Sequence, residues 1–247
     1  MRRIRELITD ARRQYPKDDF FSKFEHSCRI STAKRSSYRA YNKALMVLDD
    51  ESWQILKEKA LKHYLDHREG QKKQGFFNQL NEAFAYRYLL GKGFENVRFI
   101  KEGTGKSPDI SFNDQRYCEV KTLGISNDEM NRRSTQSVYG GAVYASLSEG
   151  FLKKFKDHVN QAWKQIHAFG EKGFVFVIIR FDDIALDYYQ DYRKQLIRFS
   201  EDQRFDNLFI KIGLLGSRRI CIKSGCKGLS ALRASCPRAV ALRWKDK

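Results

Sequence analysis

The stretch Ser107-Pro-Asp-Ile-Ser-Phe-Asn-Asp-Gln-Arg-Tyr-Cys-Glu-Val-Lys-Thr122 decides which fold we expect for this chain. Polar and apolar residues alternate on both sides of positions 113–115, a pattern that predicts two strands joined by a tight turn. We therefore expect a β-hairpin over residues 108–122. Side chains two positions apart on a strand point to the same face of a sheet, so Glu119 and Lys121 share one face.

The length of the turn decides whether Asp109 joins that pair. A two-residue turn would place Asp109 opposite Cys118 and would mix charged and apolar side chains on both faces. A three-residue turn over 113–115 would place Asp109 opposite Glu119 and would separate the two kinds of side chain. A slip of one residue turns every side chain to the other face, so we predict the three-residue turn, or a bulge with the same effect. The buried face would then hold Ile110, Phe112, Cys118 and Val120.

Two carboxylates and a lysine would thus converge near one end of the hairpin. Carboxylates are hard oxygen ligands that suit Mg²⁺ or Mn²⁺, so Asp109 and Glu119 are candidate metal ligands and catalytic residues. A bound divalent ion can polarise a phosphodiester and lower the pKa of a bound water. Lys121 would add positive charge where negative charge develops during cleavage. The alternative is a surface hairpin with ordinary charges, because Pro-Asp followed by Glu-x-Lys also arises by chance.

The pair Pro108-Asp109, followed one strand later by Glu119-Val120-Lys121, resembles the signature of the PD-(D/E)xK nuclease superfamily. That superfamily includes many restriction endonucleases, junction resolvases and repair nucleases. Its core order of helix, three strands, helix and strand is similar to the pattern over residues 75–181. The resemblance implies an α/β protein with a restriction-endonuclease-like three-layer core and a mixed central sheet, preceded here by an N-terminal helical module.

A third acidic candidate precedes the hairpin. Glu82, followed by Leu89-Leu90 and Gly93-Phe94, is similar to the first core helix of that superfamily. The resemblance implies that Glu82 is a further catalytic residue and metal ligand. The alternative is an ordinary glutamate on the solvated side of a helix.

Two further sets of candidates follow the hairpin. Members of the superfamily often carry a glutamine on the helix after the motif lysine, which makes Gln161 and Gln165 accessory candidates. Arg132 and Arg133 lie in a long polar loop, where they could contact nucleic-acid phosphates. The alternatives are solvated helix residues for the glutamines and an ordinary mobile loop for the arginines.

Hydrophobic periodicity divides the chain into three parts. We expect a helical module over residues 1–70, the nuclease-like domain over 71–223 and a basic tail over 224–247. Within the helical module, one helix is expected over 36–48 and the next after a cap at Asp49 or Asp50. The remaining predicted elements are a helix from 76 to 91, a strand at 97–100, a helix over 149–169, a fully covered strand over 174–181, a helix over 187–199 and a closing hairpin over 208–223.

The net charge of +17 and the isoelectric point near 9.7 favour a polyanionic partner. Nucleic acid is preferred to a membrane, since no apolar stretch is long enough to cross a bilayer and no strongly amphipathic basic helix stands out. Residues 217–247 alone hold nine basic and one acidic residue, which adds non-specific affinity for phosphates. The charged first ten residues do not resemble a signal peptide, so a cytoplasmic protein is expected.

The five cysteines are expected to be thiols in that compartment. Cys28 before the hairpin and Cys221, Cys226 and Cys236 after it are similar in order to the iron–sulfur branch of the superfamily. The spacing of the later cysteines departs from that branch, and Gln165 stands where the branch has a tyrosine. We therefore expect neither an iron–sulfur cluster nor zinc.

These residues and the charge lead to the expectation of a Mg²⁺- or Mn²⁺-dependent endonuclease that hydrolyses phosphodiester bonds in DNA. Double-stranded DNA is the expected partner. A role in restriction, defence or repair is expected from the breadth of the superfamily alone. Two alternatives stay open: a non-cleaving nucleic-acid-binding module on the same fold, and an RNA-directed nuclease. Many members of the superfamily dimerise, so a homodimer is compatible with the resemblance.

Overall fold

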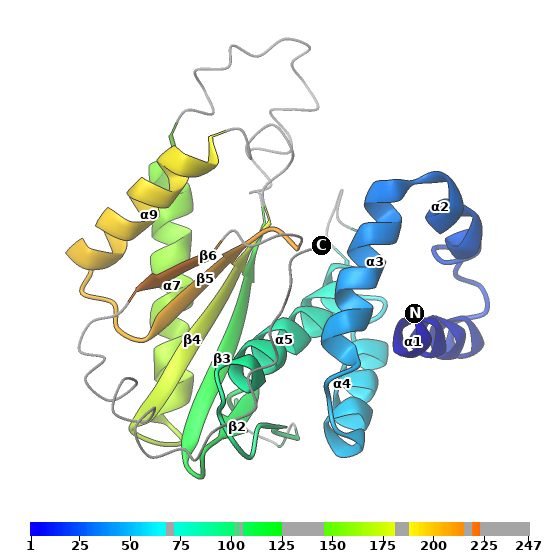
Figure 1. The fold of residues 1–247 in the computed structure, drawn as a ribbon, viewed down its shortest axis with the longest axis horizontal. Coiled ribbons are helices and arrows are strands. Elements are labelled where there is room, and N and C mark those ends of the chain that lie inside the picture. Colours follow the sequence, from blue (N-terminus) through cyan, green and yellow to red (C-terminus); the bar gives the residue numbers. More distant parts are fainter. Residues whose placement is uncertain are drawn as a thin grey trace.

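The chain forms an α/β protein in which N-terminal helices precede a six-stranded mixed, open sheet with interleaved helices (Figure 1). Of the residues considered above, Arg132, Arg133 and the basic tail lie outside the described part of the chain. Within that part, no helix combines the length and the apolar character needed to cross a membrane. The computed structural model describes residues 1–67, 72–101, 103, 106–124, 146–180, 188–214 and 219–222.

Four helices form the N-terminal part, and side-chain caps determine where two of them begin. The Asp49 carboxylate accepts a hydrogen bond from the backbone amide of Ser52 at 2.7 Å, which confirms the predicted cap. In the preceding helix, the Ser31 hydroxyl accepts a hydrogen bond from the backbone amide of Lys34 at 3.2 Å. That helix therefore begins at Thr32 rather than at position 36. The helices are α1 (Arg2–Gln14), α2 (Phe24–Ile30), α3 (Thr32–Leu45) and α4 (Asp50–Lys62).

The sheet and its helices follow in the predicted order. The strands are β1 (Arg98–Phe99), β2 (Ile110–Phe112), β3 (Arg116–Leu123), β4 (Lys172–Ile179), β5 (Leu208–Ile212) and β6 (Arg219–Ile222), and the helices are α5 (Gln74–Gly91), α7 (Glu149–His167) and α9 (Tyr189–Asp202). Each strand neighbours the next one along the chain. The central strands β3, β4 and β5 run parallel, which requires crossover connections, and α7 and α9 lie in those connections. The outer pairs are antiparallel, so the predicted mixed sheet is confirmed.

The β2–β3 hairpin has the predicted three-residue turn. Ile110 pairs with Cys118, and this register, continued by one residue, places Asp109 opposite Glu119. Residues 113–115 have positive φ angles of 45°, 43° and 91°. The first two are asparagine and aspartate, which tolerate this left-handed conformation better than most residues, so the local sequence supports the turn.

The sheet lies between two layers of helices (Figure 1). Helices α7 and α9 pack on one face, and α5 with the N-terminal helices packs on the other. Alternation along β3 directs Cys118 toward the α5 side and Lys121 toward α7. Ile110, Phe112 and Cys118 are buried as predicted, whereas Val120 is half-buried and packs against the same apolar cluster.

One buried apolar cluster joins the N-terminal helices to the sheet. It extends from Ile4 in α1 to Phe209 in β5 without interruption. Buried polar contacts follow the same path: the Tyr41 hydroxyl donates to Asn81 Oδ1 at 3.0 Å, and Asn81 Nδ2 donates to Thr122 Oγ1 at 3.0 Å. These bonds connect α3, α5 and β3, and they fix the rotation of α5 against the strand that carries the candidate residues.

Gly173 provides a test of how β4 packs against α7. A β-carbon at this position would collide with the Ile166 side chain and would lie 2.9 Å from the Tyr117 carbonyl oxygen. We expect Gly173→Ala to lower the free energy of unfolding by about 1–3 kcal/mol, measured by urea denaturation. Gly150→Ala is the control, because a β-carbon there meets nothing within 4 Å and alanine favours the helix. Equal stability of both variants would contradict this packing.

Candidate active site

A pocket of ≈ 270 Å³ lies between α5, β3 and α7. It gathers residues that are far apart in the sequence, because α5 and α7 cover opposite faces of the sheet and both supply side chains to it (Figure 1). Its walls include the predicted residues Glu82, Asp109, Glu119, Lys121 and Gln161. The predicted core of the site is therefore assembled in one place.

Asp109 precedes β2 and is held by the backbone of the neighbouring strand. Its Oδ2 atom accepts a hydrogen bond from the Val120 amide at 2.8 Å. The carboxylate thus takes the place of a main-chain acceptor just before β2 begins, where β3 continues beyond it. This contact fixes one carboxylate against the strand that carries Glu119 and Lys121.

Glu119 and Lys121 project from β3 toward α7, as the two-residue spacing predicts. Glu119 is only 3% exposed, and its Oε1 atom accepts a hydrogen bond from Lys121 Nζ at 2.7 Å. The same ammonium donates to Gln165 Oε1 at 2.7 Å. The other carboxylate oxygen of Glu119, Oε2, is buried and has no hydrogen-bond partner among the described residues. Lys121 is therefore held between two acceptors, while Glu119 keeps one oxygen available for a ligand.

Glu82 on α5 is paired with a lysine that the sequence analysis did not identify. Lys59 Nζ lies 3.0 and 2.9 Å from the two carboxylate oxygens of Glu82 and 3.3 Å from Asp109 Oδ1. Lys59 belongs to α4 and is 7% exposed. Its helical spacing from Leu56 and Ala60 places it on the apolar stripe of α4, and a lysine in such a stripe is the signal that could have revealed it.

Three other residues of the pocket were also missed. Asn78 and Gln79 lie one turn before Glu82 on α5, and their buried side-chain oxygens lack hydrogen-bond partners within the described structure. His158 on α7 directs Nδ1 to the Lys154 carbonyl oxygen at 3.0 Å. Spacing of three or four residues from Glu82 could have indicated Asn78 and Gln79, whereas His158 carried no comparable signal.

Burial dominates the electrostatics of these groups. It raises the pKa of Glu119 to about 8, with the charge of Asp109 acting in the same direction and Lys121 opposing it. Burial and the charge of Asp109 also raise the pKa of Glu82, against the influence of Lys59. For Lys59, burial alone would lower the pKa, but the carboxylates of Glu82 and Asp109 outweigh it and raise the pKa. The His158 pKa is lowered, first by burial, which favours a neutral ring.

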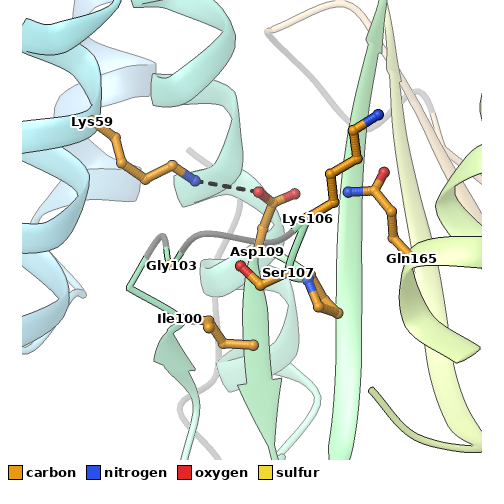
Figure 2. A pocket seen from close by; sticks show the side chains of 8 residues that line it. Lys59, Ile100, Gly103, Lys106, Ser107, Asp109 and Gln165 are labelled. Atoms are coloured by element: carbon orange, nitrogen blue, oxygen red, sulfur yellow. Dashed lines mark hydrogen bonds and ion pairs between the residues drawn. The ribbon is translucent and has the colours of Figure 1, made fainter. Parts of the chain in front are cut away.

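A second pocket of ≈ 280 Å³ meets the first at Asp109 (Figure 2). Lys59 enters it from the N-terminal helices and Gln165 from α7, and the Lys106 side chain extends between them. Ser107 adds a hydroxyl group. This pocket is lined by two lysines, Lys59 and Lys106, and by one carboxylate, Asp109, whereas the first pocket is rich in carboxylates. Because Lys59 is already paired with Glu82 and Asp109, Lys106 is the lysine of this lining that could attract an anion.

The donor atoms of the first pocket suit a hard cation. Carboxylate and amide oxygens are the ligands that Mg²⁺ and Mn²⁺ prefer, and the unpaired oxygens of Asn78, Gln79 and Glu119 are of this kind. Among the described residues, no group of three His, Cys, Asp or Glu side chains is arranged to hold one metal ion. Because Lys59 binds Glu82, the pocket fits an ion held by Asp109 and Glu119 and completed by neutral oxygens or water, as Mg²⁺ sites often are.

The cysteines lie elsewhere. Cys28 and Cys118 are buried free thiols, and Cys221 is exposed. Burial raises the pKa of Cys118, as expected for a thiol in the core. Cys226 and Cys236, the other two cysteines compared above with the iron–sulfur branch, lie outside the described residues.

The raised pKa of Glu119 predicts how stability depends on pH. Between its ordinary value of 4.5 and about 8, the folded protein keeps a proton that the unfolded chain releases. In the presence of EDTA, stability should therefore fall as the pH rises through this range. Glu119→Gln imitates the protonated carboxyl, so we expect this variant to lose less stability, as measured by urea denaturation at several pH values. Glu171→Gln, at an exposed position, should follow the wild type; a parallel loss in all three proteins would contradict the buried charge.

Comparison of the whole chain with protein-family models, with curated proteins and with solved structures finds no match. The resemblance to PD-(D/E)xK nucleases therefore rests on the short motifs of the sequence alone. The fold class and the arrangement of the site follow from the structure of this chain and from no similarity to a known protein.

Proposed function

We propose that this chain is a Mg²⁺- or Mn²⁺-dependent endonuclease of restriction-endonuclease-like fold that hydrolyses phosphodiester bonds in double-stranded DNA. The observation that carries the proposal is the buried Oε2 atom of Glu119, which has no partner within the described structure and belongs to a pocket shared with Asp109 and Lys121. A buried carboxylate oxygen without a partner is costly, and a divalent cation would compensate its charge.

The residues of the pocket have separate roles in this proposal. Asp109 and Glu119 hold the ion, which, when bound, lowers the pKa of a water molecule and polarises the phosphodiester. Lys121 presents its ammonium group beside the scissile phosphate and stabilises the negative charge that develops there. Gln165 keeps Lys121 in this position through the hydrogen bond of 2.7 Å. A group held by two acceptors loses little freedom during the reaction, which favours catalysis.

The nucleic-acid substrate is supported by charge. The whole chain carries a net charge of +17, which favours a polyanion. The second pocket, with Lys106 and Ser107, lies directly beside Asp109 and could receive a backbone phosphate next to the one that is cleaved. A neighbouring anion site of this kind would help to place the scissile phosphate in the first pocket.

Cleavage of DNA tests the proposal. Supercoiled plasmid, linear double-stranded DNA, single-stranded DNA and RNA are incubated with the protein and Mg²⁺, Mn²⁺ or EDTA. We expect cutting of double-stranded DNA that needs the metal and falls by about 10²–10³-fold in Lys121→Gln, because the positive charge at the phosphate is lost. Lys172→Gln removes the same charge from an exposed position on β4 and should cut like the wild type.

Other results of the same assay would exclude this reading. Cutting that persists in EDTA or in Lys121→Gln would place the activity elsewhere. Salt-sensitive binding without cutting of any substrate would favour the non-cleaving nucleic-acid-binding module. Preferential cleavage of RNA would favour the RNA-directed alternative.

The contact between Gln165 and Lys121 gives a separate prediction. Gln165→Ala removes one of the two acceptors of the Lys121 ammonium, so we expect kcat to fall by about tenfold with a smaller change in KM. Asn160→Ala, an exposed amide on the same helix, is the control and should leave both constants unchanged. An unchanged kcat in Gln165→Ala would show that Glu119 alone positions the lysine.

A further inference from the structure

Lys59 is a buried cation that bridges two carboxylates of the candidate site. Its ammonium nitrogen lies 3.0 and 2.9 Å from the oxygens of Glu82 and 3.3 Å from Asp109 Oδ1. It reaches this position from α4, a helix of the N-terminal part, and not from the sheet or from the helices that connect its strands (Figure 2). The N-terminal helices thus contribute a side chain directly to the pocket.

The buried neighbours of Lys59 within α4 are apolar and do not themselves call for a charge. Lys59 lies in the apolar stripe of α4 with Leu56 and Ala60, where an uncharged side chain of similar length would fill the same space. Burying an ammonium costs free energy unless it is closely paired, and buried lysines are rare for this reason. What the position does supply is a positive charge between Glu82 and Asp109.

A cation between two carboxylates is what the second ion of a two-metal site provides. In such sites two metal ions lie about 3.5–4 Å apart, and a carboxylate group bridges them. Here Asp109 is the shared group: it contacts Lys59 on one side and lies beside Glu119, with its unpaired oxygen, on the other. Both oxygens of Glu82 are already bound by Lys59, so no carboxylate oxygen of Glu82 is left without a cation.

The charge of the pocket supports the same conclusion. Its three carboxylates, Glu82, Asp109 and Glu119, face two ammonium groups, those of Lys59 and Lys121. A bound ion requires its carboxylate ligands to be deprotonated. With all five groups charged in this way, one negative charge is uncompensated, and one divalent ion more than balances it. A second divalent ion beside the same two lysines would leave an excess of three positive charges in a buried site, which is strongly unfavourable.

We infer that Lys59 occupies the position of a second metal ion, so that the site binds one divalent cation, held by Asp109 and Glu119. Lys59 is then a positioning residue that keeps Glu82 and Asp109 oriented. This inference rests on the proposed metal-dependent function, since it concerns the number of ions in that site. It changes the role that the sequence resemblance implies for Glu82, from metal ligand to partner of a permanent internal cation.

The test is the number of Mn²⁺ ions bound by the full chain, measured by electron paramagnetic resonance of free Mn²⁺ and by calorimetry. We expect one ion in the wild type and two in Lys59→Met, in which Glu82 and Asp109 become free to hold the second. Lys43→Met removes a charge from an exposed position on α3 and should still bind one ion. Two ions in the wild type, or one in a folded Lys59→Met, would overturn the inference.

Two further measurements cover a failure of Lys59→Met to fold. If the buried Glu82 charge unfolds this variant, added Mn²⁺ should restore its circular dichroism spectrum, since the ion replaces the ammonium; an unfolded protein at saturating Mn²⁺ would overturn the inference. The double variant Lys59→Met/Glu82→Gln removes both charges and should bind one ion, and two ions there would also overturn it. Absence of Mn²⁺ binding in every variant would overturn the proposed function together with this inference, whereas two ions in the wild type would overturn the inference alone.

Discussion

Compensation of buried negative charge is the constraint on which the arrangement of this molecule depends. Glu82, Asp109 and Glu119 come from α5, from the start of β2 and from β3, and they meet in one pocket. Such groups are stable together only if positive charges lie close to them. Lys121 provides one from the same strand, but Lys59 comes from α4, so the N-terminal helices have to pack against the sheet for the pocket to exist.

The packing around α5 shows how this requirement is met. Asn81, the neighbour of Glu82, accepts a hydrogen bond from Tyr41 of α3 and donates one to Thr122 of β3. The helix that carries Glu82 is therefore fixed by uncharged polar groups against both α3 and β3. Apolar contacts alone would allow α5 to rotate slightly, whereas directional hydrogen bonds specify one orientation.

The sequence predicted those parts of the site that depend on local rules. The register of the hairpin followed from the sorting of Ile110 and Cys118 to one face, and the shared direction of Glu119 and Lys121 followed from the period of a strand. The apolar stripe of α4 could have marked Lys59 as unusual, but its partners could not be predicted, because pairing across two helices is a tertiary property. The start of β4 at Lys172, before the predicted position 174, also had a tertiary cause, since pairing with β3 extends to its first residue.

The unbroken apolar cluster from α1 to β5 has a consequence for how this protein could have evolved. Binding modules that are exchanged between enzymes usually meet the catalytic part through a limited, polar surface and a linker. Here the helical region and the sheet share one interior, and a side chain of the former lies among the carboxylates of the latter. The two regions are thus constrained to change together, and recombination that replaced the helices with an unrelated module would remove both the core and a charge of the site.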